Sequence, residues 1–346
     1  MKPLFIKNFT REQLEAWVAS LGEKPFRARQ LYKHLYARNV SSWSECTDLS
    51  RAFCARLESD ATLHALAVSR VDAASDGTRK YLFRLHDSNF IESVLIPDPP
   101  RCTLCVSSQA GCALGCKFCL TGSMGFKRNL QTAEIVDQVC HALRDPELGS
   151  KINSLVFMGM GEPLANYDEV LRALAIITDP DGLMFSHRRV TLSTAGLVPQ
   201  MRRLGTTTPV NLAISIHAPN DALRDQLMPV NRTYPLGELM RACREYPLQA
   251  RKRITFEYIL LDSVNDSPVH AKELVRLLKG VRAKINLIAF NPHPGSIYRT
   301  PSQEKILDFQ DVLRKANLTA IIRKSRGSEI GAACGQLAAK IVTRDS

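Results

Sequence analysis

Residues 111–122 read GCALGCKFCLTG and space three cysteines as C-x-x-x-C-x-x-C. Cys112, Cys116 and Cys119 would supply thiolates, soft ligands that favour zinc or an iron–sulfur cluster. A closed zinc site normally takes four protein ligands, and no second C-x-x-C or H-x-x-x-H follows in the chain. The pattern therefore favours a [4Fe–4S] cluster held by three cysteines, which leaves one iron open to an outside ligand.

Strands and helices alternate from about residue 102 onward. The predicted strands are seven apolar segments: 103–107, 154–158, 190–193, 210–216, 253–260, 284–290 and 319–323. The predicted helices lie between them, near 132–144, 167–177, 236–246, 267–279 and 303–315. This alternation indicates βαβ units around a parallel sheet, and it leaves open whether the sheet closes into a full or a partial barrel. In either case the chemistry belongs at the carboxyl ends of the strands.

Two smaller regions precede this α/β domain, which we assign to residues 102–346. Residues 1–62 are predicted to form short helices, because Thr10-Arg-Glu-Gln13 fits a capping box and a second helical stretch opens after Pro25. That second stretch is basic, which suits either a solvated helix face or contact with RNA. Residues 63–101 change to a period of two around a turn and predict a β-hairpin extension or linker.

The composition limits the class of protein. Among 346 residues, 46 Lys+Arg against 34 Asp+Glu give 46 − 34 = +12, and 45% of residues are hydrophobic. This content argues against disorder and coiled coil, and the charge favours a polyanionic partner. No apolar run is long enough for a transmembrane helix, and the amino terminus turns charged too early for a signal peptide. We expect a cytoplasmic protein with no membrane partner, whose ten cysteines are free, metal-bound or catalytic.

Polar motifs follow several predicted strands. They are FMGMGEPLAN (157–166), LSTAG (192–196), ISIHAP (214–219) and AFNPHPG (289–295). Each alone suits an ordinary strand-end turn, although Glu162 could pair with an ammonium group. Together they are expected to converge on one pocket, because the carboxyl ends of parallel strands share one rim.

Three further residues have both a structural and a chemical interpretation. Cys334 could be a buried cysteine at a helix start, or a nucleophile whose pKa falls near a helix N-terminus and the basic run 323–326. Cys105 could be a core residue or could face the pocket, because it lies on the strand that enters the cysteine loop. Glu92 would be a half-buried carboxylate, and such a group is more often paired than catalytic. The other cysteines are expected to be structural: Cys46, Cys54, Cys102, Cys140 and Cys243.

The cysteine loop, placed after a first barrel strand, resembles that of the radical S-adenosylmethionine (SAM) superfamily. Nearly the whole chain is similar to the RlmN/Cfr family of adenosine methyltransferases, and most similar to its RlmN branch. The segments that carry this resemblance are TLCVSSQAGCALGCKFC, FMGMGEPLAN, RRVTLSTAG, AISIHAPN, KINLIAFNP and RKSRGSEIGAACGQL. The resemblance implies an α/β fold in which a radical SAM partial (β/α) barrel carries a helical N-terminal accessory domain and a β-hairpin extension.

The resemblance also implies roles for individual residues. Cys112, Cys116 and Cys119 would bind a [4Fe–4S] cluster. The positions that match SAM contacts are Gly161, Glu162, Ser193, Ser215, Ile216, His217 and Asn291. By the same resemblance Cys334 would be methylated, Cys105 would resolve a covalent RNA adduct and leave a transient disulfide, and Glu92 would accept a proton.

The implied activity is methylation of C2 of adenosine in the peptidyl-transferase centre of 23S rRNA and next to the anticodon in tRNAs. Two SAM molecules would be used per turnover, with an S-methylcysteine intermediate and a reduced flavodoxin- or ferredoxin-type electron donor. We expect a monomer. Two alternatives remain at this point: a Cfr-like methyltransferase that acts on C8, and a non-enzymatic RNA-binding protein with structural zinc.

Overall fold

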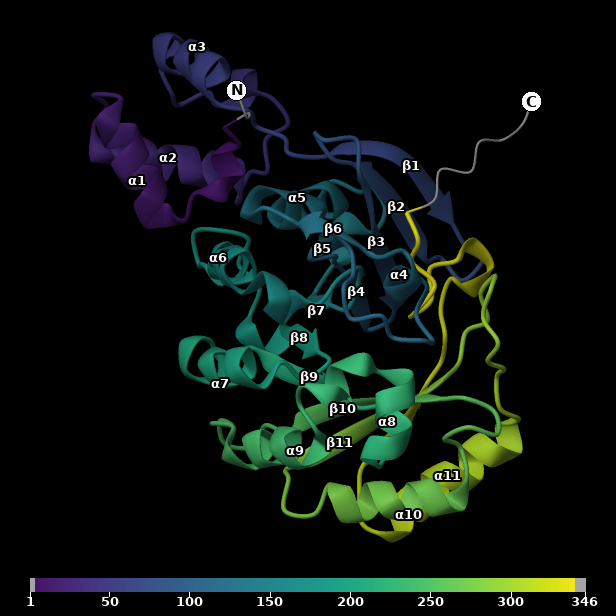
Figure 1. Ribbon diagram of the computed structural model, residues 1–346. Helices are drawn as coiled ribbons and strands as arrows, with labels where there is room; N and C mark the ends of the chain where they lie inside the picture. The colour runs from purple at the N-terminus through teal and green to yellow at the C-terminus, as the bar shows by residue number, and fades with distance from the viewer. Residues whose placement is uncertain (1–3, 340–346) are drawn as a thin grey trace, which may run out of the picture.

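A single large sheet organises the molecule in the computed structural model, which describes residues 4–339 (Figure 1). Its strand order is β1-β2-β3-β4-β7-β8-β9-β10-β11-β12. The strands are β1 (Ala67–Ala73), β2 (Arg79–Arg84), β3 (Phe90–Asp98), β4 (Arg101–Cys105), β7 (Ser154–Phe157), β8 (Val190–Thr194), β9 (Asn211–Ser215), β10 (Ile254–Leu260), β11 (Ala283–Ala289) and β12 (Ala320–Arg323). From β4 to β12 all neighbours are parallel, so the seven predicted strands are confirmed.

Helices connect the parallel strands. They are α5 (Thr132–Leu143), α6 (Tyr167–Thr178), α7 (Val198–Thr207), α8 (Asp221–Leu227), α9 (Leu236–Glu245), α10 (Pro268–Leu277) and α11 (Gln303–Lys315). The ring of Tyr258 on β10 contacts the tilted ring of Phe309 on α11, with 5.1 Å between the centroids, so the even-numbered side chains of β10 face the helices. Because side chains alternate along a strand, Glu257 and Ile259 face the interior. The inner face of this sheet is where the polar strand-end motifs gather.

The predicted hairpin is present and joins the main sheet. β2 and β3 pair antiparallel, and the Leu85 N–H donates to the Asn89 carbonyl at 2.8 Å across the turn. β3 in turn pairs antiparallel with β4. The sequence did not predict β1, nor the separate two-stranded sheet of β5 (Gln109–Gly111) and β6 (Phe126–Asn129). The hairpin is therefore continuous with the sheet that carries the site.

Three helices form the N-terminal region: α1 (Arg11–Ser20), α2 (Pro25–Leu35) and α3 (Arg51–Asp60). The predicted capping box at Thr10 and Gln13 is present, with both reciprocal hydrogen bonds. The remaining helical segments are short: α4 (Leu120–Ser123) and the 3-10 turns Ile6–Asn8, Trp43–Glu45, Gly149–Lys151, Pro163–Asn166, His187–Arg189, Pro229–Arg232 and Ser328–Ile330. Within residues 4–339 we find no helix with the length and apolarity needed to cross a membrane.

A buried ion pair joins the N-terminal region to the sheet domain. The Lys7 ammonium contacts the Asp137 carboxylate on α5, and both side chains are fully buried. The second oxygen of Asp137 accepts hydrogen bonds from the backbone N–H groups of Ala65, at 2.6 Å, and Leu66. Asp137 therefore holds the segments on both sides of the N-terminal helices against α5.

We expect Lys7→Met to lower the free energy of unfolding by about 3–5 kcal/mol, because Asp137 would then be a buried charge without its cation. Urea unfolding followed by circular dichroism measures this loss. The double variant Lys7→Met/Asp137→Leu removes both charges and should be more stable than the single variant. A double variant that is no more stable than Lys7→Met would contradict this account.

Candidate active site

The cysteine loop leaves the sheet after β4 and is bracketed by β5 and β6. The Cys112 N–H donates to the carbonyl of Gly125 at 3.1 Å, which closes the base of the loop. Gly111 has a φ of +75°, and a Cβ there would lie 1.9 Å from the Gly125 carbonyl oxygen. Only glycine fits at this position, so the backbone of the loop is fixed where the first cysteine begins.

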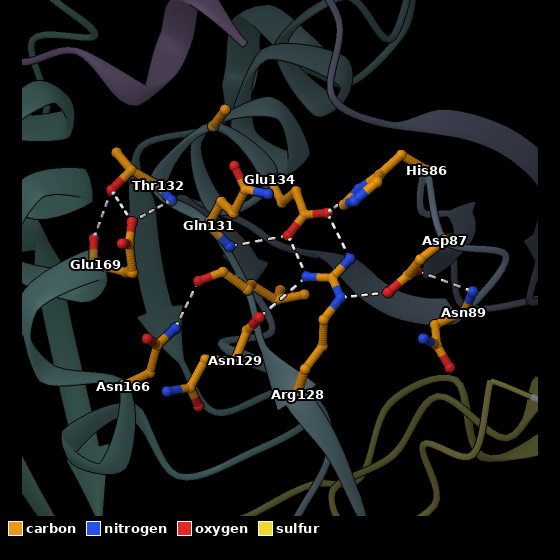
Figure 2. A network of polar contacts seen from close by, with 12 residues as sticks. His86, Asp87, Asn89, Arg128, Asn129, Gln131, Thr132, Glu134, Asn166 and Glu169 are labelled. Carbon is orange, nitrogen blue, oxygen red and sulfur yellow. Dashed lines mark hydrogen bonds and ion pairs between the residues drawn. The ribbon is translucent and has the colours of Figure 1, made fainter. Parts of the chain in front are cut away.

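A charged network fixes the other end of β6 (Figure 2). Arg128 donates to both carboxylate oxygens of the buried Glu134 on α5, at 2.7 and 2.8 Å, and also contacts Asp87 in the β2–β3 turn. Glu134 also accepts the Gln131 N–H at 2.8 Å, as part of the cap of α5. His86 lies 3.3 Å from the same carboxylate. The hairpin, the loop and the start of α5 are thus held by one arginine.

The three loop cysteines fit an iron–sulfur cluster better than a single ion. Cys112, Cys116 and Cys119 are half-buried free thiols, and Cys116 and Cys119 pack against an apolar group around Phe118. Burial raises the pKa of Cys112 to about 11 and that of Cys116 further, so a bound metal would have to displace the thiol protons. In residues 4–339 the three sulfur atoms do not all lie within 4.8 Å of one another, as the ligands of one ion would. Three thiols spaced more widely suit the corners of a [4Fe–4S] cluster.

Glu162 lies buried at the end of β7, in the first strand-end motif. One carboxylate oxygen accepts the Leu164 N–H at 3.0 Å and the other accepts the Ala195 N–H at 2.7 Å, so the motifs after β7 and β8 are joined. Burial raises the pKa of Glu162. Gly161, with a φ of +97°, packs so closely on Gln109 that a Cβ would lie 2.5 Å from the Gln109 side chain. The carboxylate is therefore held in one orientation on the inner rim.

The motifs after β8 and β9 lie beside it. Ser193 is buried on β8. β8 pairs in parallel with β9, the strand that carries Ser215. Ile216 is fully buried, and His217 follows it with a φ of +55°. The Nδ1 atom of His217 accepts the Ile259 N–H at 3.0 Å, and burial, with the nearby Arg224 charge, lowers the pKa of His217 to about 3. A neutral imidazole thus fixes the end of β9 against β10.

The C-terminal segment lies against the cysteine loop, as its yellow trace beside α4 suggests (Figure 1). The Leu120 N–H donates to the Gly335 carbonyl at 2.8 Å, and the Thr121 hydroxyl donates to the Leu337 carbonyl at 2.6 Å. Asn291, after β11, donates from Nδ2 to the Cys334 carbonyl at 3.2 Å. Residues far apart in the sequence are therefore brought together around Cys334.

Both interpretations of Cys334 placed it at a helix start, and this is wrong, as is the lowered pKa of the nucleophile interpretation. Residues 332–339 form turns and irregular chain, so there is no helix N-terminus at the sulfur. Solvent reaches Cys334, yet the surrounding protein atoms and then the Glu257 charge raise its pKa to about 11. Without a bound cation, this residue is a protonated thiol.

Cys105 is buried on β4 and faces the same interior. Burial raises the pKa of Cys105 well above the usual range, and the nearby Cys334 raises it further. The two thiols therefore lie close enough to interact electrostatically. Both are free, and the structure gives no support to a resting disulfide between them. Cys102 stands at C-x-x-C spacing from Cys105, but an odd separation on a strand points the two side chains to opposite faces.

Glu92 of β3 is buried and paired on both oxygens. One oxygen lies 3.2 Å from the Lys80 ammonium, and the other accepts the Ala338 N–H at 2.9 Å. The structural interpretation of Glu92 as a paired carboxylate is therefore confirmed. The bond to Ala338 also connects β3 to the segment that carries Cys334.

Sequence reasoning missed two buried groups of this site. Glu257 on β10 pairs in register with Ser215 and accepts a 2.8 Å hydrogen bond from Asn286, and burial raises its pKa to about 7. The available sequence signal for Glu257 was a carboxylate at an inward position of an otherwise apolar strand. Arg224 on α8 is fully buried, although an arginine in a short polar helix predicts a solvated side chain.

A second group of potential metal ligands lies elsewhere. His64, Asp137 and His141 have ligand atoms within 4.8 Å of one another, and burial lowers the pKa of His141 to about 4. However, both oxygens of Asp137 are already occupied, one by the Lys7 ammonium. A dication would bring an uncompensated charge beside that ammonium, so we assign this group to the docking of the N-terminal region.

Comparison with known proteins gives a consistent result. The model of the radical SAM superfamily matches residues 106–278, and that of the ribosomal RNA large subunit methyltransferase N-terminal domain matches residues 5–63. The dual-specificity RNA methyltransferase RlmN of Syntrophobacter fumaroxidans is 64% identical over 98% of this chain and 99% of its own length. The protein of the same name from Geotalea uraniireducens is 51% identical over 99% and 98%. The crystal structure of a radical SAM methyltransferase from Sphaerobacter thermophilus has a TM-score of 0.94 at 44% identity, covering 98% of this chain and 100% of that one.

We expect Arg128→Met to loosen the bracket of the cysteine loop, because buried Glu134 would lose its bidentate partner. Amide hydrogen exchange in β5 and β6 should become about tenfold faster, as measured by mass spectrometry. Arg172→Met, which removes a partly exposed pair with Glu169, is the matched control and should leave these amides unchanged. Equal protection of β5 and β6 in both variants would rule out the anchoring role.

Proposed function

The chain belongs to the RlmN family of dual-specificity RNA methyltransferases, and from that premise we propose that it methylates C2 of adenosine in 23S rRNA and in tRNA. We further propose the adenosine of the peptidyl-transferase centre and the adenosine next to the tRNA anticodon as targets. Membership of this family sets aside the alternative of a non-enzymatic zinc protein. The predicted α/β radical SAM fold is confirmed as well.

The enzyme uses a [4Fe–4S] cluster and two SAM molecules per turnover. When bound, these cofactors supply a methyl group and the radical that removes a hydrogen atom from it. We propose that Cys112, Cys116 and Cys119 hold the cluster. The residues that we propose to contact SAM are Gly161, Glu162, Ser193, Ser215, Ile216, His217 and Asn291. Support comes from their common position on the inner rim at the ends of β7, β8, β9 and β11.

A protein nucleophile is needed because C2 of adenine is electrophilic and carries no acidic proton. We propose that Cys334 first accepts a methyl group as a thiolate, forming S-methylcysteine. The sulfonium that donates the methyl group is cationic, and a nearby cation lowers the pKa of a thiol. The methyl carbon on Cys334 then forms a bond to C2, which tethers the RNA to the protein through a thioether.

Release of the product needs a base and a second thiol. Glu92 is proposed to accept the C2 proton, which requires its contact with Lys80 or Ala338 to loosen. Cys105 would then attack the sulfur of Cys334 as a thiolate. The S–C bond would break with its electron pair on carbon, which takes up a proton and becomes the methyl group of the RNA, and the one unpaired electron of the adduct would return to the cluster. A Cys105–Cys334 disulfide forms, which a cellular thiol must reduce before the next turnover.

One observation carries this proposal: hydrogen bonds hold the carbonyl of Cys334 against Asn291 and the carbonyls of Gly335 and Leu337 against the cysteine loop. RNA affinity is proposed to come from the +12 net charge and from two basic regions, the N-terminal helices and residues 323–326. Arg323 and Lys324 are exposed, and Arg27 stacks at 4.8 Å on the exposed Phe26. The target adenine must be unstacked to enter the site.

The second candidate is methylation of C8, which would use the same residues. Mass spectrometry of methylated nucleosides from rRNA and tRNA, with C2- and C8-methyladenosine as standards, separates the two. A reduced flavodoxin- or ferredoxin-type protein is proposed as the electron donor. We also propose that the enzyme works as a monomer in the cytoplasm.

We expect Cys334→Ala to reduce RNA methylation to background, because no other residue is proposed to carry the methyl group. Nucleoside mass spectrometry after reaction with reconstituted enzyme measures this. Cys54→Ala, at a half-buried thiol on α3, is the control and should retain wild-type methylation. Substantial methylation by Cys334→Ala would refute the cysteine relay.

We expect Cys105→Ala to be isolated with RNA covalently bound at Cys334, because the thioether would form but could not be resolved. Nuclease digestion followed by peptide mass spectrometry should find a nucleotide joined through a methylene group to the Cys334 peptide. The wild-type protein should give little of this product. An active Cys105→Ala enzyme without adduct would remove Cys105 from the mechanism.

A further inference from the structure

We propose that Arg224 is a positioning residue that fixes the carboxyl ends of β8 and β9 and supplies a positive charge to the cysteine loop. Nothing in the proposed cycle uses this residue. The inference goes beyond that cycle, and it rests on the proposed role of the three loop cysteines in binding the cluster.

The hydrogen bonds of Arg224 support the positioning role. Nη2 donates to the carbonyls of Ala195 at 2.6 Å and Ser215 at 3.2 Å, and Nε donates to the carbonyl of Ile216 at 3.2 Å. Nη1 donates to Oδ1 of Asn231 at 2.9 Å. These carbonyls belong to the strand-end motifs after β8 and β9. A guanidinium presents donors in a fixed planar fork, so one side chain can hold both strand ends where a lysine could not.

The charge of Arg224 is buried without a direct counter-ion. Its side chain has no exposed surface, and within residues 4–339 no carboxylate lies within 4.0 Å of it. Asn231 stands between Arg224 and the acidic residues of α8, because its amide donates to Asp221 at 2.9 Å and Asp225 at 2.7 Å. A buried charge that lacks an ionic partner costs several kcal/mol, so its retention needs a reason.

The nearest candidate for a counter-charge is the cysteine loop. The Lys117 N–H donates to the Leu227 carbonyl at the end of α8, at 3.0 Å. Leu223 and Leu227 pack with Cys116 in one apolar group. Burial lowers the pKa of Arg224 to about 10, and the nearby Cys116 opposes that shift. Arg224 therefore lies between two residues that pack with Cys116, in a buried region of low dielectric where charges interact strongly.

A cation in this position has a definite electrostatic consequence. Three thiolates and the cluster they hold carry net negative charge, and reduction adds one more electron to it. A fixed positive charge nearby favours the reduced state and so raises the reduction potential. Removing that charge should make the cluster harder to reduce, whereas removing only the hydrogen bonds should not.

Two substitutions separate charge from hydrogen bonding. Arg224→Lys keeps the charge and loses most of the fork, and Arg224→Gln loses the charge but keeps an amide donor. Arg232→Gln removes an exposed positive charge close by and is the matched control. Each protein is reconstituted anaerobically, its iron and sulfide are counted, and its cluster potential is measured by redox titration with electron paramagnetic resonance.

We expect Arg224→Gln to shift the potential to more negative values, while Arg224→Lys and Arg232→Gln stay near wild type. If Arg224→Gln cannot retain a cluster and Arg224→Lys can, the need for the charge is also supported. An unchanged potential in a fully loaded Arg224→Gln protein overturns the role of the charge. Equal failure of both Arg224 variants to load supports the positioning role, because both substitutions lose most of the fork. If wild type itself takes up no cluster, the proposed function fails instead.

Discussion

The site depends on holding three thiols in one apolar loop, and the loop has too little regular structure of its own to do so. Three other segments supply the constraint. The β5–β6 bracket closes its base, α8 bonds to it through the Leu227 carbonyl, and the C-terminal segment bonds to it through the Gly335 carbonyl. Two of these segments come from chain more than 100 residues away in the sequence. The geometry of the loop therefore depends on contacts with distant segments of the chain.

Much of the fold could be predicted because each parallel strand is a short apolar run bounded by turn residues. The alternation of strands and helices then fixed the order, and the polar motifs at the strand ends identified the rim. β5 and β6 escaped prediction because strands of three and four residues show no clear alternation. The helix expected at Cys334 failed for a related reason: its small residues suit a helix, but tertiary hydrogen bonds from Leu120 and Asn291 hold the segment in a turn.

The two buried charges that sequence reasoning missed share a cause. Arg224 lies in a helix whose other polar residues are solvated, so its pattern indicates a surface position. Glu257 interrupts an apolar strand, and only the register with Ser215 and Asn286 reveals that it faces the interior. In both cases the decisive information is which neighbours surround the side chain, which no local pattern contains.

The buried charges near the site are opposite in sign to the groups that are proposed to bind beside them. The carboxylates Glu162 and Glu257 lie on the inner face of the sheet, where a coenzyme with ammonium and sulfonium groups would supply the positive charge that they lack. Arg224 bonds to the carbonyls at the ends of β8 and β9, and its helix α8 bonds to the loop whose thiols would become negative on binding iron. Under the proposed assignment of these residues, the coenzyme and the cluster would each compensate buried charges that the other does not. The free energy that those charges cost the empty protein would then be recovered on binding.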